Sequence, residues 1–439
     1  SYPDGIWDRI PQQVREMLLD NLAYAVAMHL PMKFREMKGL HFHSGRPFFE
    51  PYFLQNFLRD IPSCCDMDGS DIGRETVRFL ELEFRFDDEG MKLPPSWPGT
   101  AGQGGSRAIV PLSFGKDSLL TFAVSEELGL DPVPVFVDEP GFSRERYHKE
   151  ILGRAFRQEF GKELHILDHT TGLLRDDGHL GCDGNEYGWG LQSTEYALLM
   201  LPFARAFGAG YILFGNEQTA SSSYADTSGR WTVYPCYDQS AFWTGHINAM
   251  TAALTGADPV RTGSLIEPLM DMMIQRILVR RYPEYAAYQM SCFAEGEAGK
   301  DQRWCHSCSI CAKMYLMCLG AGIDPKAVGF ERSMLTEEHI RFFTLFGGHS
   351  EFPYARTGTA RDEQLFAFHC AARFGAEEPL VERFRKSSLA DEALAREREL
   401  FRRFVHIYPA LTVPEETKET LTALYREEID HFINQYEGS

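Results

Sequence analysis

Six consecutive residues, 113–118, combine side chains and backbone groups that suit the binding of phosphate. They read S-F-G-K-D-S and lie between a short apolar stretch, 108–112, and a stretch with helical spacing, 119–128. A turn from a strand into a helix leaves the first N–H groups of the helix unpaired, with the positive end of the helix dipole behind them. Gly115 is expected to take a backbone shape that other residues resist and to let phosphate approach closely. The segment predicts an anion site to which Lys116 adds a cation.

Asp117 is unusual in such a site, and we expect it either to order the loop or to hold Mg²⁺. The segment is not a Walker A motif, because G-x-x-x-x-G-K-[ST] is absent. Taken alone, the six residues also fit an ordinary polar turn between a strand and a helix.

A second group of chemically capable residues is a cluster of cysteines. Cys305, Cys308 and Cys311 follow one another at three-residue spacing, and Cys292 lies upstream. Four thiolates in this arrangement can surround one tetrahedral Zn²⁺, and a site closed by four protein ligands is structural. His306 is an alternative ligand, and a redox-active pair or an iron–sulfur cluster is the competing interpretation. Four other cysteines are expected in the core or at the surface: Cys64, Cys65, Cys318 and Cys370.

Two further stretches carry candidate site residues. The run G-N-E-Q-T-A-S-S-S at 215–223 directly follows an apolar segment, and its Asn216 and Glu217 are candidates for Mg²⁺ or substrate contacts. A solvated loop with a helix N-cap is the simpler interpretation. The aromatic segment 231–246 contains Cys236, Asp238 and Gln239, and it fits a substrate-pocket wall or a plain core segment equally well.

The elements that must position these residues alternate along the chain. Short apolar segments predict strands at 108–112, 134–137, 164–167 and 211–214. Helical spacing predicts helices at 119–128, 144–160 and 193–207. This alternation predicts an α/β fold with a parallel sheet covered on both faces, which binds ligands at the carboxyl ends of its strands.

The regions on either side of the sheet have a different character. The alternating segment 77–86 predicts a strand, the aromatic segment 41–53 could supply more, and the Pro- and Gly-rich segment 93–106 predicts a linker. We therefore expect three units. These are a small α+β domain at 1–106, a nucleotide-binding domain with the cysteine cluster at 107–332, and a charge-rich helical region at 333–439.

Composition limits the class of protein. The 439 residues carry a net charge of −19, which argues against general nucleic-acid binding but not against one nucleotide held by local groups. No run of about 18 apolar residues predicts a membrane span, and the polar start lacks a signal-peptide core. Ten cysteines in so long a chain do not form a secreted disulfide framework. A cytoplasmic enzyme is expected, with no prediction of its oligomeric state.

The loop S-F-G-K-D-S resembles that of the PP-loop ATP pyrophosphatases, in which it cradles the pyrophosphate to be released. With N-E-Q-T-A-S at 216–221, V-Y-P-C-Y-D-Q-S at 233–240 and R-W-C-H-S-C-S-I-C at 303–311, the chain resembles the ATP-dependent epimerases of UDP-N-acetylmuramoyl-L-alanyl-L-glutamate. Deazaguanine-nitrile synthases of the PP-loop class have similar cysteine clusters after the nucleotide domain. The resemblance spans roughly residues 109–370 and does not include the first hundred.

The chain also departs from the epimerase pattern. That family favours Gly at the position of Phe114. It has Asn-His-Gln and a Lys in the segment where this chain has Tyr234, Pro235, Cys236 and Gln239. The resemblance therefore implies the chemistry more strongly than the substrate.

The resemblance implies a Rossmann-like fold of the adenine nucleotide alpha hydrolase type, with ATP, Mg²⁺ and Zn²⁺ as ligands and a small-molecule or glycopeptide substrate. The segment 135–138, at the end of the second strand, would read adenine. The implied nucleotide-binding residues are Ser113, Phe114, Gly115, Lys116, Asp117, Ser118, Val137, Gly215 and Asn216.

The implied reaction has two stages. A substrate carboxylate attacks the α-phosphorus of ATP, and the resulting acyl-adenylate makes the adjacent Cα–H acidic enough for removal and return on the other face. The candidate catalytic residues are Asp117, Lys116, Glu217, Asp238 and Cys236, with His169 as a further candidate base. The alternatives are a PP-loop enzyme that forms an amide, nitrile or thio group, and a nucleotide sensor without catalysis.

Overall fold

Five short strands form the central sheet of the computed structural model, which describes residues 1–3, 5–90, 93–95, 97, 106–140, 143–182, 186–256, 258–348 and 357–439. The strands are β3 (Arg107–Pro111), β4 (Asp131–Asp138), β5 (His165–Asp168), β6 (Tyr211–Leu213) and β9 (Arg261–Gly263). Their order is β5-β4-β3-β6-β9, and every pairing is parallel. β3 is the first strand of this sheet in the sequence. β4 and β5 follow on one side of it, and β6 and β9 then follow on the other side. The switch point therefore lies between β3 and β6, where such sheets bind ligands.

Helices cover both faces of this sheet. On one face pack α5 (Lys116–Glu127), α6 (Ser143–Phe160) and α10 (Asp271–Arg281), and on the other pack α8 (Gln192–Phe207) and α9 (Ala241–Thr255). In β3, Ala108 and Val110 join the first core and Ile109 joins the second. An apolar run buried on both faces is what a central parallel strand requires.

The four predicted strands and the three predicted helices of this region are confirmed, apart from shifts of a few residues at their ends. The fifth strand, β9, was not predicted. Its three residues, R-T-G, contain no apolar run, and β9 is defined by its pairing with β6 through Tyr211 and Arg261.

The amino-terminal region is a mixed α and β unit. It contains α1 (Gln12–Ala27), α2 (Leu30–Lys33), β1 (Gly39–Gly45), α3 (Glu50–Asp68), α4 (Ile72–Leu80) and β2 (Glu83–Asp88). β1 and β2 form a separate parallel pair. The core of this unit is continuous with α8, α9 and one face of the sheet. Most of the predicted linker at 93–106 lies outside the described residues.

The predicted strand at 77–86 is wrong in its first half and confirmed in its second. Residues 77–80 end helix α4, and only 83–88 form a strand. Residues 77–80 are helical because two features stabilise α4. The Asp71 carboxylate caps the helix by accepting a hydrogen bond from the Arg74 amide at 2.7 Å, and Ile72 and Phe79 are buried on one helical face. Likewise, the aromatic segment 41–53 supplies β1 but then enters helix α3.

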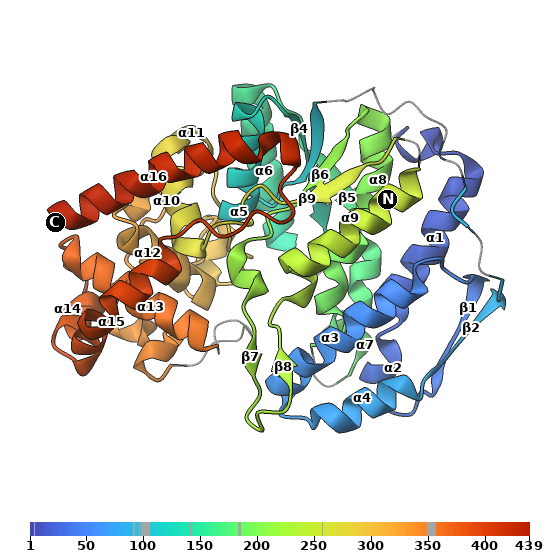
Figure 1. The fold of residues 1–439 in the computed structure, drawn as a ribbon, viewed down its shortest axis with the longest axis horizontal. Helices are drawn as coiled ribbons and strands as arrows, with labels where there is room; N and C mark the ends of the chain where they lie inside the picture. Colours follow the sequence, from blue (N-terminus) through green and yellow to red (C-terminus); the bar gives the residue numbers. More distant parts are fainter. Residues whose placement is uncertain are drawn as a thin grey trace.

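The carboxyl-terminal region is helical, as predicted, and Figure 1 shows it at the opposite end of the molecule from α1–α4. It contains α13 (Gly358–Arg373), α14 (Pro379–Arg385), α15 (Ser388–Phe404) and α16 (Lys418–Gly438). Together with α12 (Ser309–Gly320) it shares a core with α5 and α10. The remaining short elements are α7 (Asp177–Leu180), α11 (Pro283–Ala286) and the hairpin of β7 (Tyr224–Ala225) and β8 (Thr232–Val233). Within the described ranges, no helix combines the length and apolarity needed to cross a membrane.

Candidate functional site

The loop between β3 and α5 lies at the switch point of the sheet, and its backbone is shaped by Phe114. This residue has a φ of +57°, in the left-handed region that glycine prefers. Its ring is buried and packs edge-on against Phe156 at 5.6 Å, and its carbonyl accepts a 2.7 Å hydrogen bond from the Met290 amide. The strained backbone at this position is held by a buried aromatic ring.

The expectation for Gly115 is therefore wrong in one respect. Gly115 has a φ of −68°, which any residue adopts, and the glycine-like conformation belongs to Phe114. A Cβ at Gly115 would meet Ser113 Oγ at 3.4 Å and Ser291 Oγ at 3.8 Å, which are ordinary contacts. As the N-cap of α5, Gly115 has no side chain to accept from the first amides of the helix, so these amides remain available to a ligand.

The two serines of the loop order it from within. Ser118 Oγ donates to the Gly115 carbonyl at 3.1 Å and lies 3.3 Å from Ser113 Oγ, which accepts from the Gly115 amide at 3.4 Å. These contacts close the turn around the helix start.

A lysine that the sequence analysis missed fixes the outer side of the loop. Lys149, on α6, is buried, and its ammonium donates to the Ser113 carbonyl and, at 2.7 Å, to the Met290 carbonyl. Burial lowers the pKa of Lys149 to about 8, although the neighbouring Glu145 carboxylate raises it. Lys149 thus joins the loop to the segment that leads into the cysteine cluster.

The run after β6 lies directly against the start of α5. A Cβ on Gly215 would come within 2.9 Å of the Asp117 Cβ and 3.2 Å of the Ser118 amide nitrogen, so this position requires glycine. The next residue, Asn216, turns away, since its side-chain amide donates to Thr244 Oγ1 at 3.0 Å. Glu217 accepts from the Thr219 amide at 2.5 Å.

A cavity of about 320 Å³ lies beside these two loops. Four of the predicted site residues line it: Lys116, Asp117, Glu217 and Cys236. The rest of its wall is formed by Ala220, Gln239, Asp271, Ser291, Ser309, Ile310, Lys313, Met314, Met317, Phe342, Phe343, Ala360, Glu363 and Gln364. The wall therefore combines charged groups, including Lys313 of α12 and Glu363 of α13, with apolar side chains such as Met314, Met317 and Phe343.

Asp271, the first residue of α10, organises charged groups of the wall. One of its oxygens lies 2.5 Å from the Lys116 ammonium, and the other contacts the Lys313 ammonium. Lys116 also contacts Asp117. Burial acts to raise the pKa of Asp271, but the two ammonium groups outweigh it and lower the pKa. Asp271 is thus an anion that holds two lysines in the cavity wall, and the sequence analysis missed both Asp271 and Lys313.

Two other acids in the wall, Glu217 and Asp117, hold their protons to a higher pH than usual. Burial raises the pKa of Glu217 well above its ordinary value, and the Asp271 carboxylate raises it further. Burial also raises the pKa of Asp117, against the opposing effect of Lys116. The pKa of the Cys236 thiol is raised by burial and then by the Asp238 and Glu217 carboxylates. A cation placed here would favour the ionised carboxylates.

Nine of the predicted nucleotide-binding and catalytic residues do not line the cavity. Six belong to the two loops described above, namely Ser113, Phe114, Gly115, Ser118, Gly215 and Asn216, and the other three lie farther from these loops in the sequence. Asp238 is buried behind Cys236, and its carboxylate accepts a 2.9 Å hydrogen bond from the Ser193 amide at the start of α8. His169 is buried 2.7 Å from the Glu195 carboxylate. Val137 is buried at the carboxyl end of β4.

The aromatic segment 231–246 contributes to both the cavity and the core. Cys236 and Gln239 line the cavity. Trp243 is fully buried, and its indole N–H donates to Thr194 Oγ1 at 2.7 Å. The interpretation as a core segment is therefore correct for Trp243, while Cys236 and Gln239 line a cavity whose ligand stays a prediction.

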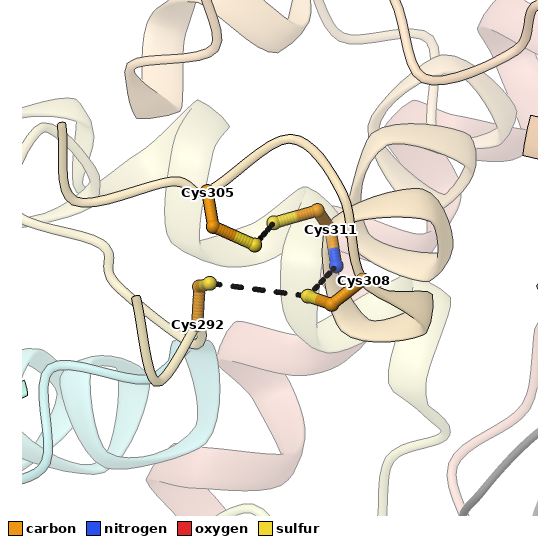
Figure 2. Close-up of side chains that lie close together, drawn as sticks. All are labelled: Cys292, Cys305, Cys308 and Cys311. Carbon is orange, nitrogen blue, oxygen red and sulfur yellow. Dashed lines mark hydrogen bonds between the residues drawn. The ribbon is translucent and has the colours of Figure 1, made fainter. Parts of the chain in front are cut away.

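The four clustered cysteines meet as the sequence predicts, and they could bind a metal such as zinc (Figure 2). Their sulfur atoms all lie within 4.8 Å of one another, with Cys292–Cys308 and Cys305–Cys311 separations of 3.9 Å. Zn–S bonds of about 2.3 Å at tetrahedral angles place sulfurs about 3.8 Å apart. The spacing fits one ion better than an iron–sulfur cluster, which would spread its ligands over several irons.

Hydrogen bonds also support thiolate ligands at this site. The Ala294 amide donates to the Cys292 sulfur at 3.2 Å, and the Cys311 amide donates to the Cys308 sulfur at 3.4 Å. His306 is not part of the group, because its ring accepts from the Glu331 amide at 3.4 Å. The other cysteines expected in the core or at the surface are all buried: Cys64, Cys65, Cys318 and Cys370.

The cysteine site and the cavity share a helix. Cys308 is the N-cap of α12, Cys311 is in its first turn, and Lys313 follows two residues later and reaches Asp271. A metal bound by the cysteines would therefore fix the start of the helix that forms one wall of the cavity.

No protein-family model matches this chain, and the comparison with curated proteins also finds no match.

Proposed function

We propose that this protein is an ATP-dependent enzyme of the PP-loop type that cleaves ATP between its α- and β-phosphates. The observation that carries the proposal is the position of the 113–118 loop. It begins a helix at the switch point between β3 and β6, and its Lys116 lines a cavity. Helix-start amides and a buried ammonium are groups that hold phosphate. The strand order also agrees with a Rossmann-like fold of the adenine nucleotide alpha hydrolase type.

One acid of the cavity fits a role in holding Mg²⁺ together with the phosphates. Among the described residues, the cavity carboxylates form no group of three whose oxygens lie within 4.8 Å of one another. Mg²⁺ is usually bound by one or two carboxylates and completed by phosphate oxygens and water, and Asp117 suits that share. When bound, the ion would neutralise charge on the phosphates that leave.

The proposed reaction begins with adenylation. An oxygen of the substrate carboxylate forms a bond to the α-phosphorus, the bond from that phosphorus to the bridging oxygen breaks, and pyrophosphate leaves. Removing a proton beside an ionised carboxylate would create a dianion, and the mixed anhydride avoids this. A base then takes the Cα proton, an acid returns a proton to the opposite face, and water releases AMP.

Glu217 and Cys236 are the proposed proton carriers. They line the same cavity and come from different segments, one after β6 and one before α9, an arrangement that fits two groups acting on opposite faces of one carbon. Burial raises both pKa values, so both groups hold their protons in the ligand-free protein. The ionised form of Glu217 would be favoured beside a bound Mg²⁺, and this carboxylate would then take the Cα proton as the base, while the Cys236 thiol would return a proton as the acid. Asp238 does not line the cavity, and its role in the proposal is to position Cys236 and raise its pKa.

The proposed substrate is the L-glutamate residue of a UDP-MurNAc-L-Ala-L-Glu-like peptidoglycan precursor or a related peptide. The motifs at 216–221, 233–240 and 303–311 support it. Two departures from the epimerase pattern, Cys236 and Gln239, line the cavity. The substrate is therefore the property in which we most expect this protein to differ from the epimerases. Zinc at the four cysteines and a cytoplasmic location complete the proposal.

The test is incubation with ATP, Mg²⁺ and a panel of muramyl-peptide precursors, with AMP formation and uptake of deuterium from D₂O at the α-carbon followed together. The proposal expects both signals with the same precursor. AMP formation only when ammonia or a sulfur donor is added would instead establish the amide, nitrile or thio-forming alternative. Nucleotide binding without turnover would support a sensor.

A further inference from the structure

The β1–β2 pair lies on the opposite side of the molecule from α12, whose start carries Cys308 and Cys311 (Figure 1). Phe42 of β1 pairs with Phe86 of β2, and both rings are buried and stacked at 5.3 Å. Because side chains alternate along a strand, the neighbouring His41, His43 and Asp87 face the solvent together.

These three side chains converge on one point. The Nε2 atom of His41 lies 3.0 Å from one oxygen of Asp87, and the Nδ1 atom of His43 lies 3.2 Å from the other. All three ligand atoms lie within 4.8 Å of one another. Ligand atoms about 2.0–2.1 Å from a tetrahedral zinc ion are about 3.3 Å apart. The two separations here are direct polar contacts, and the one to His43 is a hydrogen bond, so the ligand atoms already lie near the spacing that one ion would need in place of these contacts.

We propose that His41, His43 and Asp87 form a second metal site, which takes a divalent transition-metal ion of the zinc type. Imidazole nitrogens and a carboxylate oxygen are suitable ligands for such an ion. The side chains of His41 and Asp87 are 53% exposed and that of His43 is 84% exposed, so water completes the coordination. The site is open and exchangeable, unlike the group of four cysteines, three of which are buried.

The charges around the site do not compete with the ion. Arg85 lies opposite His41 in the strand register, but its guanidinium is 2.5 Å from Glu83. Arg46 is similarly paired with Glu89 at 2.6 Å. Both arginines are thus paired with carboxylates other than Asp87, which contacts the two imidazoles.

A metal at this position would connect the two strands. In the described part of the chain, β1 and β2 pair only with each other, and a two-stranded pair of this kind is marginally stable by itself. An ion that binds only the folded pair stabilises it by mass action. The site therefore acts as a cross-strand link that depends on the concentration of free metal.

The test is a calorimetric titration of Zn²⁺ into the full chain after the cysteine site has been loaded with one equivalent. The proposal expects a second equivalent to bind, and expects hydrogen exchange at 39–45 and 83–88 to slow when it does. His43→Asn and Asp87→Asn should each weaken this second binding by at least the about 10–100-fold that loss of an outer-shell partner costs. His431→Asn, which removes an exposed histidine from α16, is the matched control and should not weaken it.

Two results would overturn the proposal. One is the absence of a second equivalent in the wild-type chain, with exchange at the two strands unchanged by Zn²⁺. The other is a second equivalent that binds His43→Asn and Asp87→Asn as tightly as the wild type, which would place the ion elsewhere.

Discussion

Helices α5 and α12 both begin beside the same cavity, and their starts are built in opposite ways. The start of α5 has a glycine N-cap with no side-chain acceptor, whereas the start of α12 is capped by the Cys308 sulfur, which accepts from the Cys311 amide. Each helix then sends a lysine to Asp271. The uncapped start can receive an anion, and the thiolate-capped start suits a structural cation. The two helix starts therefore suit ligands of opposite charge, an anion at α5 and a metal cation at α12.

The largest expected effect comes from changing the α5 start. Asp117→Ala should reduce pyrophosphate release by about 10³-fold, the scale seen when one electrostatic group is removed from an active site, with the fold intact. Coupled pyrophosphate assays and circular dichroism would measure the two properties. Asp391→Ala is the matched control, because Asp391 is also in the first turn of a helix, α15. Normal release by Asp117→Ala would mean that the loop is misassigned.

The next effect concerns the α12 start. Cys305→Ser should lose the bound metal and lower the free energy of unfolding by about 3 kcal/mol or more, because metal binding at a structural site contributes directly to folding. Metal analysis and denaturant unfolding would show this. Cys318→Ala, a buried thiol on the same helix but outside the cluster, should keep the metal. Retention of one equivalent by Cys305→Ser would contradict the assignment.

A third change tests the connection between the two helices. Lys313→Met removes one of the two ammonium groups on Asp271, and kcat/KM for pyrophosphate release should fall by about 10²-fold. Lys313→Arg should recover part of the loss. Lys326→Met, at an exposed lysine nearby, should have no effect. If Lys313→Met behaves like Lys326→Met, then α12 only supports the fold.

At the start of α8, a side-chain carboxyl group of the protein already accepts a hydrogen bond from a helix amide. Asp238 accepts from the Ser193 amide there, and burial raises its pKa to about 6. The unfolded chain releases this proton near its ordinary value of 3.8. Between pH 3.8 and about pH 6, the folded state therefore binds a proton that the unfolded chain has released. The free energy of unfolding falls as pH rises through this range, by at most about 3 kcal/mol.

Asp238→Asn should remove this fall, so its free energy of unfolding should change less than that of the wild type between pH 4 and about pH 6. Urea unfolding at several pH values would measure the difference. Equal pH dependence in the two proteins would show that Asp238 does not carry the buried proton.

Local patterns predicted the parts of the site that are contiguous in sequence. The loop at 113–118 and the four cysteines combine chemistry and spacing within short segments, and the apolar runs of a parallel sheet are long enough to recognise. Asp271, Lys313 and Lys149 could not be found in this way, because each is a single charged residue on a helix and acquires its role only through tertiary contact. Strand β9 was also missed because it depends on tertiary contact, since its three residues become a strand only by pairing with β6. The helix α4 was missed because its apolar residues also fit an alternating strand.

The most direct test of the central claim is the identity of the nucleotide products. With ATP, Mg²⁺ and a precursor that supports turnover, products separated by anion-exchange chromatography should be AMP and pyrophosphate in equal amounts, and Asp117→Ala should form both about 10³-fold more slowly. ADP and orthophosphate as the products would contradict the account, because the terminal phosphate and not the inner bridge would then be the bond that breaks.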